Sequence, residues 1–312
     1  MEHYLDNSAT TRVSDAAAQA ALSAMTQCYG NPSSTHTKGR EAKKLLDTAR
    51  KQVADALGCT PEELVFTSCG SESDNWAILG GAEYMKRRGR HVISSAVEHD
   101  AVRRSLDILE ERGFEVTRLM PDATGAISAE AVMNALRGDT VLVSLMLVNN
   151  ETGAVTDIAA IARSLKKAGS SALLHTDAVQ AFMKLPFSAR TLGADMISVS
   201  GHKIHAPKGI GALYIKRGLK LKPFIVGGSQ ENGRRAGQDT TAQALQAQLQ
   251  AGRSRRTYKD FLRRFAVWQE EPHLDPDEFD LGFYSYGLRT YGNLPLIEPL
   301  ESREVKKIRD FV

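Results

Sequence analysis

The segment Ser198-Val-Ser-Gly-His-Lys203 holds the most reactive short run of side chains in this 312-residue chain. The apolar residues before it predict a strand over 196–200, so His202 and Lys203 come directly after a strand end. A lysine held in a half-buried site has a lowered pKa and becomes a nucleophile for carbonyl carbons. A lone lysine is usually solvated, so this segment indicates carbonyl chemistry only if matching groups accompany it.

An acid and several amides follow two other predicted strands. Asp177 comes after the apolar run 172–176, where a carboxylate is costly to desolvate unless it is paired. A protonated ring nitrogen would pair it, and so would a lysine or arginine; Gln180 would share its helical face. Asn149 and Asn150 end another apolar run, where an asparagine either forms a turn or donates to a phenolate oxygen.

The turn Thr67-Ser-Cys-Gly-Ser-Glu72 joins a predicted strand to a predicted helix. Its small residues let the backbone approach an anion, and the free N–H groups and the helix dipole favour phosphate. The hydroxyl of Ser71 could add a further contact. Ordinary capping of the helix is the alternative interpretation.

His99 follows the predicted strand 91–95, and its ring could stack on a planar ligand or handle protons. A capping or surface histidine is the alternative. The glycine-rich basic loop 227–237 offers Arg234 or Arg235 to an anion, or is simply an exposed loop.

Alternating strands and helices must position these groups. Short strands separated by helices of 10–15 residues predict an α/β fold, a mostly parallel sheet covered on both faces. Ligands of such sheets bind beyond the carboxyl ends of the strands, where nearly every polar cluster above falls. We expect strands at 64–68, 91–95, 115–119, 140–145, 172–176 and 196–200, and helices at 14–28, 38–57, 72–87, 100–112 and 158–167.

The composition excludes several classes of protein. Apolar residues make up 42% and charged residues 25%, a globular balance, and the net charge of +3 is too small to imply nucleic acid. No apolar run approaches the length of a membrane span, and the start lacks a basic-then-apolar signal region. Three widely spaced cysteines predict neither a disulfide framework nor a metal site, so we expect a cytoplasmic protein.

The composition changes near residue 250. Residues 251–312 contain half of the Phe, Tyr and Trp residues of the chain but only two alanines. This break predicts two units, a cofactor-binding domain over residues 1–245 and a divergent, aromatic-rich segment over 246–312.

The set of groups fits pyridoxal 5'-phosphate, an aldehyde that carries a ring nitrogen, a phenolate and a phosphate. Over about residues 3–245 the chain resembles the cysteine desulfurases, pyridoxal-phosphate enzymes of the class V aminotransferase-like group. The resemblance is carried by motifs that occur in the family's order. They are YLDNSATT at the start, GNPSSTHTKG at 30–39, FTSCGSESDN at 66–75, VEHDAV at 97–102, VNNETG at 148–153, HTDAVQA at 175–181, SGHKIHAPKGIGALY at 200–214 and GGSQENGRRAG at 227–237.

The resemblance implies the large domain of a type I pyridoxal-phosphate-dependent transferase, a homodimer that takes sulfur from L-cysteine and leaves alanine and a protein persulfide. It also implies a role in sulfur metabolism and iron–sulfur cluster biogenesis, with a sulfur-acceptor scaffold protein as a possible partner. Lys203 would bind the cofactor aldehyde and move the Cα proton. The implied cofactor contacts are Asp177 at the ring nitrogen, His99 stacked on the ring, Gln180 and Asn150 at the phenolate oxygen, and Ser71, Ser200 and His202 at the phosphate.

The chain departs from the family pattern after the lysine. The family's sulfur-accepting cysteine lies far downstream, in a C-terminal small domain, but no residue after Lys203 is a cysteine. Cys28 and Cys59 are remote from the lysine motif in sequence, and Cys69 lies in a tight turn without the reach of a mobile loop. Gln238 stands where the family has a threonine that contacts the partner subunit's phosphate. We therefore expect a missing or replaced small domain and impaired persulfide formation.

The last 50 or so residues have a different character. Residues from about 260 to 312 weakly resemble the segment that precedes the von Willebrand A-like part of predicted metallopeptidase-like proteins, as in a fusion of two partial genes. The acidic run at 275–280 is interpreted as a solvated turn, and no metal is expected. Two alternative functions remain, a class V lyase or aminotransferase that needs no protein thiol, and a non-catalytic remnant of the cofactor domain.

Overall fold

The computed structural model describes Tyr4 and residues 6–237, and the structural statements below concern that part of the chain. Its strands form one sheet in the order β1-β7-β6-β5-β4-β2-β3. The strands are β1 (Leu64–Thr67), β2 (His91–Ser95), β3 (Glu115–Leu119), β4 (Thr140–Ser144), β5 (Leu173–Asp177), β6 (Met196–Ser200) and β7 (Gly211–Ile215).

Strand β7 runs antiparallel to both of its neighbours, β1 and β6, while β2 to β6 pair in parallel. Every described strand except β7 therefore points the same way, and their carboxyl ends meet at one edge. The predicted mostly parallel α/β sheet is confirmed. The prediction missed β7, because Pro207, Gly209 and Gly211 give that stretch the local pattern of a loop.

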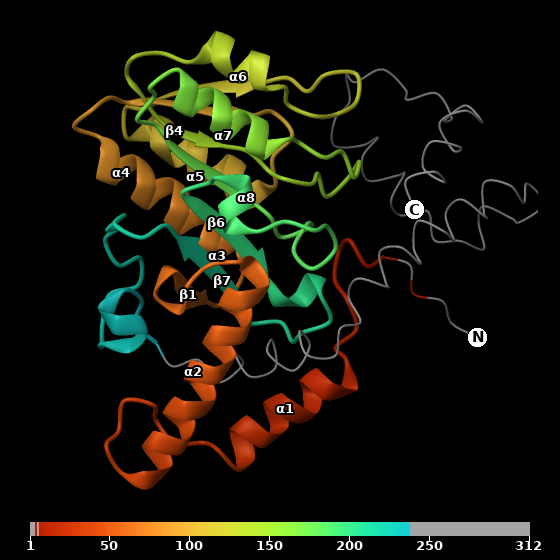
Figure 1. Ribbon diagram of the computed structural model, residues 1–312, viewed down its shortest axis with the longest axis vertical. Coiled ribbons are helices and arrows are strands. Elements are labelled where there is room, and N and C mark those ends of the chain that lie inside the picture. The colour runs from red at the N-terminus through yellow and green to blue at the C-terminus, as the bar shows by residue number, and fades with distance from the viewer. Residues whose placement is uncertain (1–3, 5, 238–312) are drawn as a thin grey trace, which may run out of the picture.

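Helices cover both faces of the sheet, as predicted (Figure 1). One face packs against α3, α4 and α5, and the other against the end of α2 and against α6, α7 and α8. Helix α1 and the start of α2 extend away from the sheet. The helices are α1 (Asp15–Thr26), α2 (Thr37–Leu57), α3 (Gly70–Asn75), α4 (Gly81–Met85), α5 (Asp100–Glu111), α6 (Ala129–Ala135), α7 (Ile158–Lys167) and α8 (Ala189–Leu192).

Local signals set several helix ends. The side chain of Ser14 accepts a hydrogen bond from the backbone N–H of Ala17, which confirms the predicted N-cap of α1. Gly58 ends α2 in the left-handed conformation (φ 66°) that glycine adopts without steric cost. The helix predicted over 72–87 is α3 and α4 joined by a π-helical turn, Trp76–Gly80.

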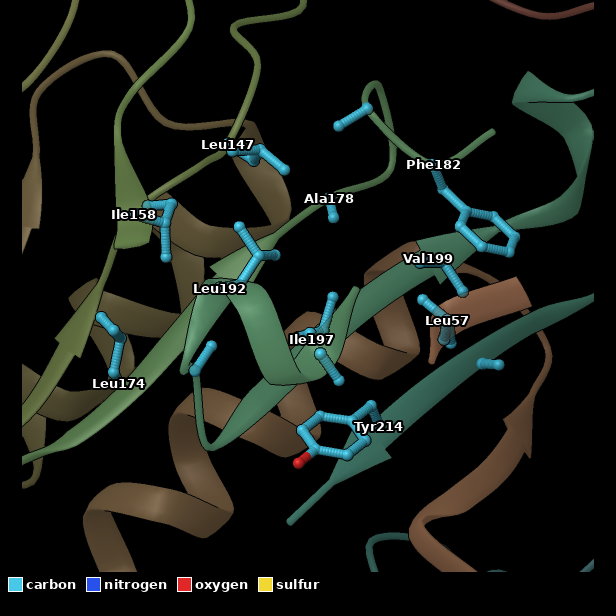
Figure 2. Packing of buried hydrophobic residues seen from close by; sticks show 14 of the residues in the cluster. Leu57, Leu147, Ile158, Leu174, Ala178, Phe182, Leu192, Ile197, Val199 and Tyr214 are labelled. Atoms are coloured by element: carbon cyan, nitrogen blue, oxygen red, sulfur yellow. The ribbon is translucent and has the colours of Figure 1, made fainter. Parts of the chain in front are cut away.

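The core on the α2 and α7 face holds the carboxyl ends of β5 and β6 in place. Figure 2 shows Val199 of β6 beside Leu57 and Phe182, with Ile197 of β6 and Leu174 of β5 farther along the same core. Phe182 is only 2% exposed and follows β5 by a few residues. Burial of each such side chain stabilises the fold by about 1.5–3 kcal/mol, so the loops after β5 and β6 start from fixed points.

Candidate active site

Lys203 lies in the short 3-10 helix η3 (Gly201–Lys203), directly after β6. Its amine donates to the backbone carbonyl oxygens of Ser8 and Ala9, the latter at 2.7 Å. Burial lowers the pKa of Lys203, and the charges of Asp177, Asp6 and Glu151 oppose that shift only in part. The N-terminal segment thus lies against the lysine that the sequence singled out.

Asp177 is the last residue of β5, the strand beside β6. It is 7% exposed, and its carboxylate accepts a hydrogen bond of 2.8 Å from the backbone N–H of Val179. Burial raises the pKa of Asp177, while this N–H and the charges of His99 and Lys203 partly offset the effect. The acid and the lysine influence each other electrostatically across the ends of two adjacent strands.

Gln180 also belongs to this cluster. Its Nε2 donates to the carbonyl oxygen of Ser8 at 2.8 Å, and Lys203 donates to the same oxygen. The two side chains that the sequence placed 23 positions apart therefore meet at one backbone atom.

The two asparagines have separate surroundings. Asn149 forms a turn, since its Oδ1 accepts from the backbone N–H groups of Glu151 and Thr152 at 2.9 Å each. Its Nδ2 donates to the carbonyl oxygen of Val97 at 2.9 Å. Asn150 donates to the Glu151 carboxylate at 2.6 Å, so its amide points to a neighbour in the chain rather than to Lys203.

His99 caps α5, because its Nδ1 accepts from the backbone N–H of Ala101 at 3.1 Å. The capping role that the sequence left open is therefore real, and it leaves Nε2 to carry the ring proton. The ring also lies near enough to Asp177 to act on its charge. One histidine thus holds the start of a helix and borders the site.

The turn before α3 packs against the end of β6. A Cβ built on Gly70 would lie 2.8 Å from Cγ2 of Val179 and 3.4 Å from Cβ of Ser200, so only glycine fits there. Ser200 is 1% exposed, and its Oγ has no hydrogen-bond partner among the described residues. Ser71, by contrast, is exposed at the start of α3. A buried hydroxyl without a partner is unusual unless a ligand uses it.

His202 lies beside the N-terminal segment, with its Nδ1 3.2 Å from Oγ1 of Thr10. Burial, together with the charges of Lys203 and other neighbouring cations, lowers the pKa of His202 to about 4. The imidazole is therefore neutral at neutral pH.

The predicted anion-binding arginines have protein partners. Arg235 is buried and donates to both carboxylate oxygens of Glu72, at 2.9 and 3.0 Å. Arg234 donates to the backbone carbonyl oxygen of Glu62 at 2.7 Å. The anion that Arg235 binds is thus a carboxylate of this chain.

Sequence reasoning missed two buried acids near Asp177. Glu98 is 2% exposed, and burial raises its pKa to about 8, with Asp177 adding to the shift. Its Oε1 accepts from Ser95 and from the backbone of Met146, whereas Oε2 has no partner among the described residues. Burial, with the charge of Asp177, raises the pKa of Asp74 well above its ordinary value. Glu98 lies in the motif VEHDAV and Asp74 in the motif FTSCGSESDN, and membership of these motifs is the sequence feature that could have pointed to them.

The three cysteines are half-buried thiols, and Cys69 directly precedes Gly70 at the start of α3. Within the described residues no group of three His, Cys, Asp or Glu side chains could hold a metal ion. In the same part of the chain, each helix is too short or too polar to cross a membrane. Residues 238–312, with Gln238, the acidic run and the divergent segment, lie outside the described residues.

Comparisons with known proteins agree with this fold. A cysteine desulfurase of Nostoc sp. is 47% identical over 234 residues, which is 75% of this chain and 58% of that protein. A solved NifS-like protein superposes with a TM-score of 0.81 at 36% identity, covering 87% of this chain and 74% of its own. A structure of SspA in complex with cysteine gives a TM-score of 0.75 at 38% identity, covering 80% and 72%.

The chain spans about three fifths of the length of the curated relatives that it matches. The pattern of the aminotransferase class-V family matches residues 3–255, which include all described strands and the lysine after β6. The chain therefore belongs to the aminotransferase class-V family, and its relatives there include cysteine desulfurases and NifS-like proteins.

Proposed function

We propose that this protein uses pyridoxal 5'-phosphate to remove the sulfur of L-cysteine, leaving alanine. The observation that carries the proposal is the meeting of Lys203, Asp177 and Gln180 at the ends of the adjacent strands β5 and β6. A nucleophilic amine, a buried acid and an amide donor are the groups that a pyridine aldehyde with a phenolate oxygen requires. The cysteine bound to SspA, a relative at 38% identity, supports the choice of substrate.

The residues present fit this cofactor. Asp177 is the buried acid for the ring nitrogen, and Gln180 carries an N–H donor for the phenolate oxygen. The buried Oγ of Ser200 has no partner among the described residues, so it is available to a phosphate oxygen. His202 would donate a neutral N–H to the same group. His99 would lie on the ring, and Ser71 would complete the phosphate contacts. Asn150 must turn away from Glu151 to reach the phenolate oxygen.

The bound cofactor would supply an aldehyde for covalent attachment and a ring that withdraws electrons from the substrate Cα. The chain's part is to present groups in the correct charge state. Since burial lowers the pKa of Lys203, its amine more readily becomes the neutral nucleophile and proton acceptor. The Asp177 carboxylate would keep a proton on the ring nitrogen, and the backbone N–H of Val179 stabilises the negative charge of that carboxylate.

None of the three cysteines of this chain is well placed to accept the sulfur. Cys69 lies in the turn at the start of α3, while Cys28 and Cys59 lie at helix ends of the α1–α2 region. We propose that persulfide formation on this chain is impaired and that an added thiol accepts the sulfur instead. A homodimer in the cytoplasm, with a scaffold protein as acceptor, is the corresponding proposal for its physiological setting.

The test uses the purified full chain mixed with pyridoxal phosphate. We expect the visible absorption band of lysine-bound cofactor in the wild type and its loss in Lys203→Ala. Lys220→Ala, a change at an exposed lysine, is the matched control and should keep the band. Addition of L-cysteine with dithiothreitol should then release alanine and sulfide in equal amounts. A wild type without the band, or a band that persists in Lys203→Ala, would refute the proposal.

A further inference from the structure

A second lysine lies behind the proposed site, and no motif pointed to it. The Nζ of Lys184 donates to Oε1 of Gln180 at 3.0 Å. At the other end of the same amide, Nε2 donates to the carbonyl oxygen of Ser8, which also accepts from Lys203. Lys184, Gln180, Ser8 and Lys203 thus form one continuous hydrogen-bonded chain.

The chemistry of Lys184 determines which way the Gln180 amide faces. An ammonium group has three donors and no acceptor, so only the carbonyl oxygen of the amide can face it. The NH₂ group must then point away from Lys184, toward Ser8 and the site. A ligand oxygen that replaced the Ser8 contact would find the same donor, because Lys184 holds the far end of the amide.

The surroundings of Lys184 keep it close to this amide. Its side chain is largely buried, and burial, with a contribution from the charge of Lys203, lowers its pKa to about 8. It remains a cation at neutral pH, and its charge contributes to the lowered pKa of His202. The titratable groups described around the shared site fall into two sets. Beside Lys203 and Lys184 lie His202, Lys208, Asp6 and Glu151, and beside Asp177 lie His99, Glu98 and Asp74.

The backbone directly before Lys184 adopts a strained conformation. Met183 has φ of 61°, a left-handed conformation that a residue with a long side chain rarely adopts. On either side of it, Phe182 is anchored in the core and Lys184 N–H donates to the carbonyl oxygen of Ala181 at 2.9 Å. Strained conformations persist where the surrounding structure requires them, often at functional sites. Here the strained turn lies directly before the lysine that holds Gln180.

We propose that Lys184 is a positioning residue, which fixes the Gln180 amide with its N–H donor toward the site and adds positive charge that favours an anionic ligand oxygen there. The inference rests on the proposed function, because that oxygen would be the phenolate of pyridoxal phosphate. Lys184 acts through Gln180 and does not itself touch the ligand.

The first test needs no cofactor. NMR of the full chain labelled with ¹⁵N-glutamine would follow the side-chain amide of Gln180, assigned by its loss in Gln180→Leu. We expect Lys184→Met to shift or broaden this signal and Lys184→Arg, which keeps a donor and a charge, to preserve it. Circular dichroism would verify that the variants remain folded. An unchanged Gln180 signal in Lys184→Met would overturn the proposal, whether or not the protein binds cofactor.

The second test uses the protein loaded with pyridoxal phosphate. Loss of a nearby cation makes protonation of the site easier, so the pH midpoint of the visible band should rise by about half a unit or more in Lys184→Met. Lys184→Arg should keep the wild-type midpoint. In a Gln180→Leu background, Lys184→Met should shift the midpoint less than it does in the wild type. Absence of the band in the wild type would refute the proposed function alone. An identical pH midpoint in the wild type and in Lys184→Met would refute the role of Lys184.

Discussion

Glu72 and Arg235, which are 163 residues apart in the chain, form a buried ion pair with two hydrogen bonds of 2.9 and 3.0 Å. The Glu72 carboxylate also accepts from the backbone N–H and the hydroxyl of Ser68, at 2.7 and 2.6 Å. Burial opposes ionisation of Glu72, but these hydrogen bonds outweigh it and hold its pKa below the ordinary value. One carboxylate therefore joins the turn before α3 to the glycine-rich loop 227–237.

Glu72→Gln should destabilise the protein strongly, because it removes the carboxylate charge that pairs with the buried Arg235 guanidinium. We expect the free energy of unfolding in urea to fall by about 3 kcal/mol. Asp47→Asn, which breaks the exposed Lys43–Asp47 pair, is the control and should cost less than about 1 kcal/mol. Equal losses in the two variants would show that the buried pair does not hold the loop.

Gly211→Ala should disturb the turn before α3, although Gly211 lies in a strand. An added Cβ would lie 2.7 Å from the carbonyl carbon of Cys69 and 2.8 Å from Oγ1 of Thr67. Overpacking of this kind costs about 1–3 kcal/mol, measured as the change in unfolding free energy. Gly138→Ala is the matched control, since a Cβ there has no described atom within 4 Å. A Gly211→Ala variant as stable as Gly138→Ala would contradict the close packing of β7 on the turn.

Glu98 should make stability depend on pH. Its pKa is about 8 in the folded protein against an ordinary value of 4.5. The folded state therefore holds the proton more tightly than the unfolded state does. The stability gained from this protonation is complete below pH 4.5 and is lost as the pH rises through 8. The slope is about 1.4 kcal/mol per pH unit between these values. Relative to the wild type, Glu98→Gln should therefore gain roughly 2 kcal/mol of unfolding free energy from pH 6 to pH 8. Parallel curves for the two proteins over this range would show that Glu98 is ionised in the fold.

Cys59 should be the least reactive of the three thiols in the folded protein. Burial, with the charges of Glu63 and Asp55, raises the pKa of its thiol to about 12. Only the thiolate is nucleophilic, so alkylation by iodoacetamide at pH 8 should be about a thousandfold slower than in urea-unfolded protein. Peptide mass spectrometry after timed quenching would measure the rate at each cysteine. Labelling of Cys59 at the same rate in both states would contradict its burial.

The sequence by itself determined the local elements and the set of reactive side chains. The bounds of β2, β3, β6 and α7 match the predictions, because the periods of their apolar residues are local properties. Asp177, His202 and Lys203 were also placed correctly at strand ends, since each lies at or just after the end of an apolar run. Their roles toward a cofactor remain predictions that the experiments above would test.

Only the tertiary structure decided which partner each polar group has. The amide of Gln180 donates to Ser8, Arg235 pairs with Glu72, and β7 forms because β1 and β6 lie on either side of it. Lys184 became significant only when a strained turn placed it against Gln180. A hydrogen bond or an ion pair depends on position and direction in space, and groups from distant parts of the chain acquire these only when the whole sheet is assembled.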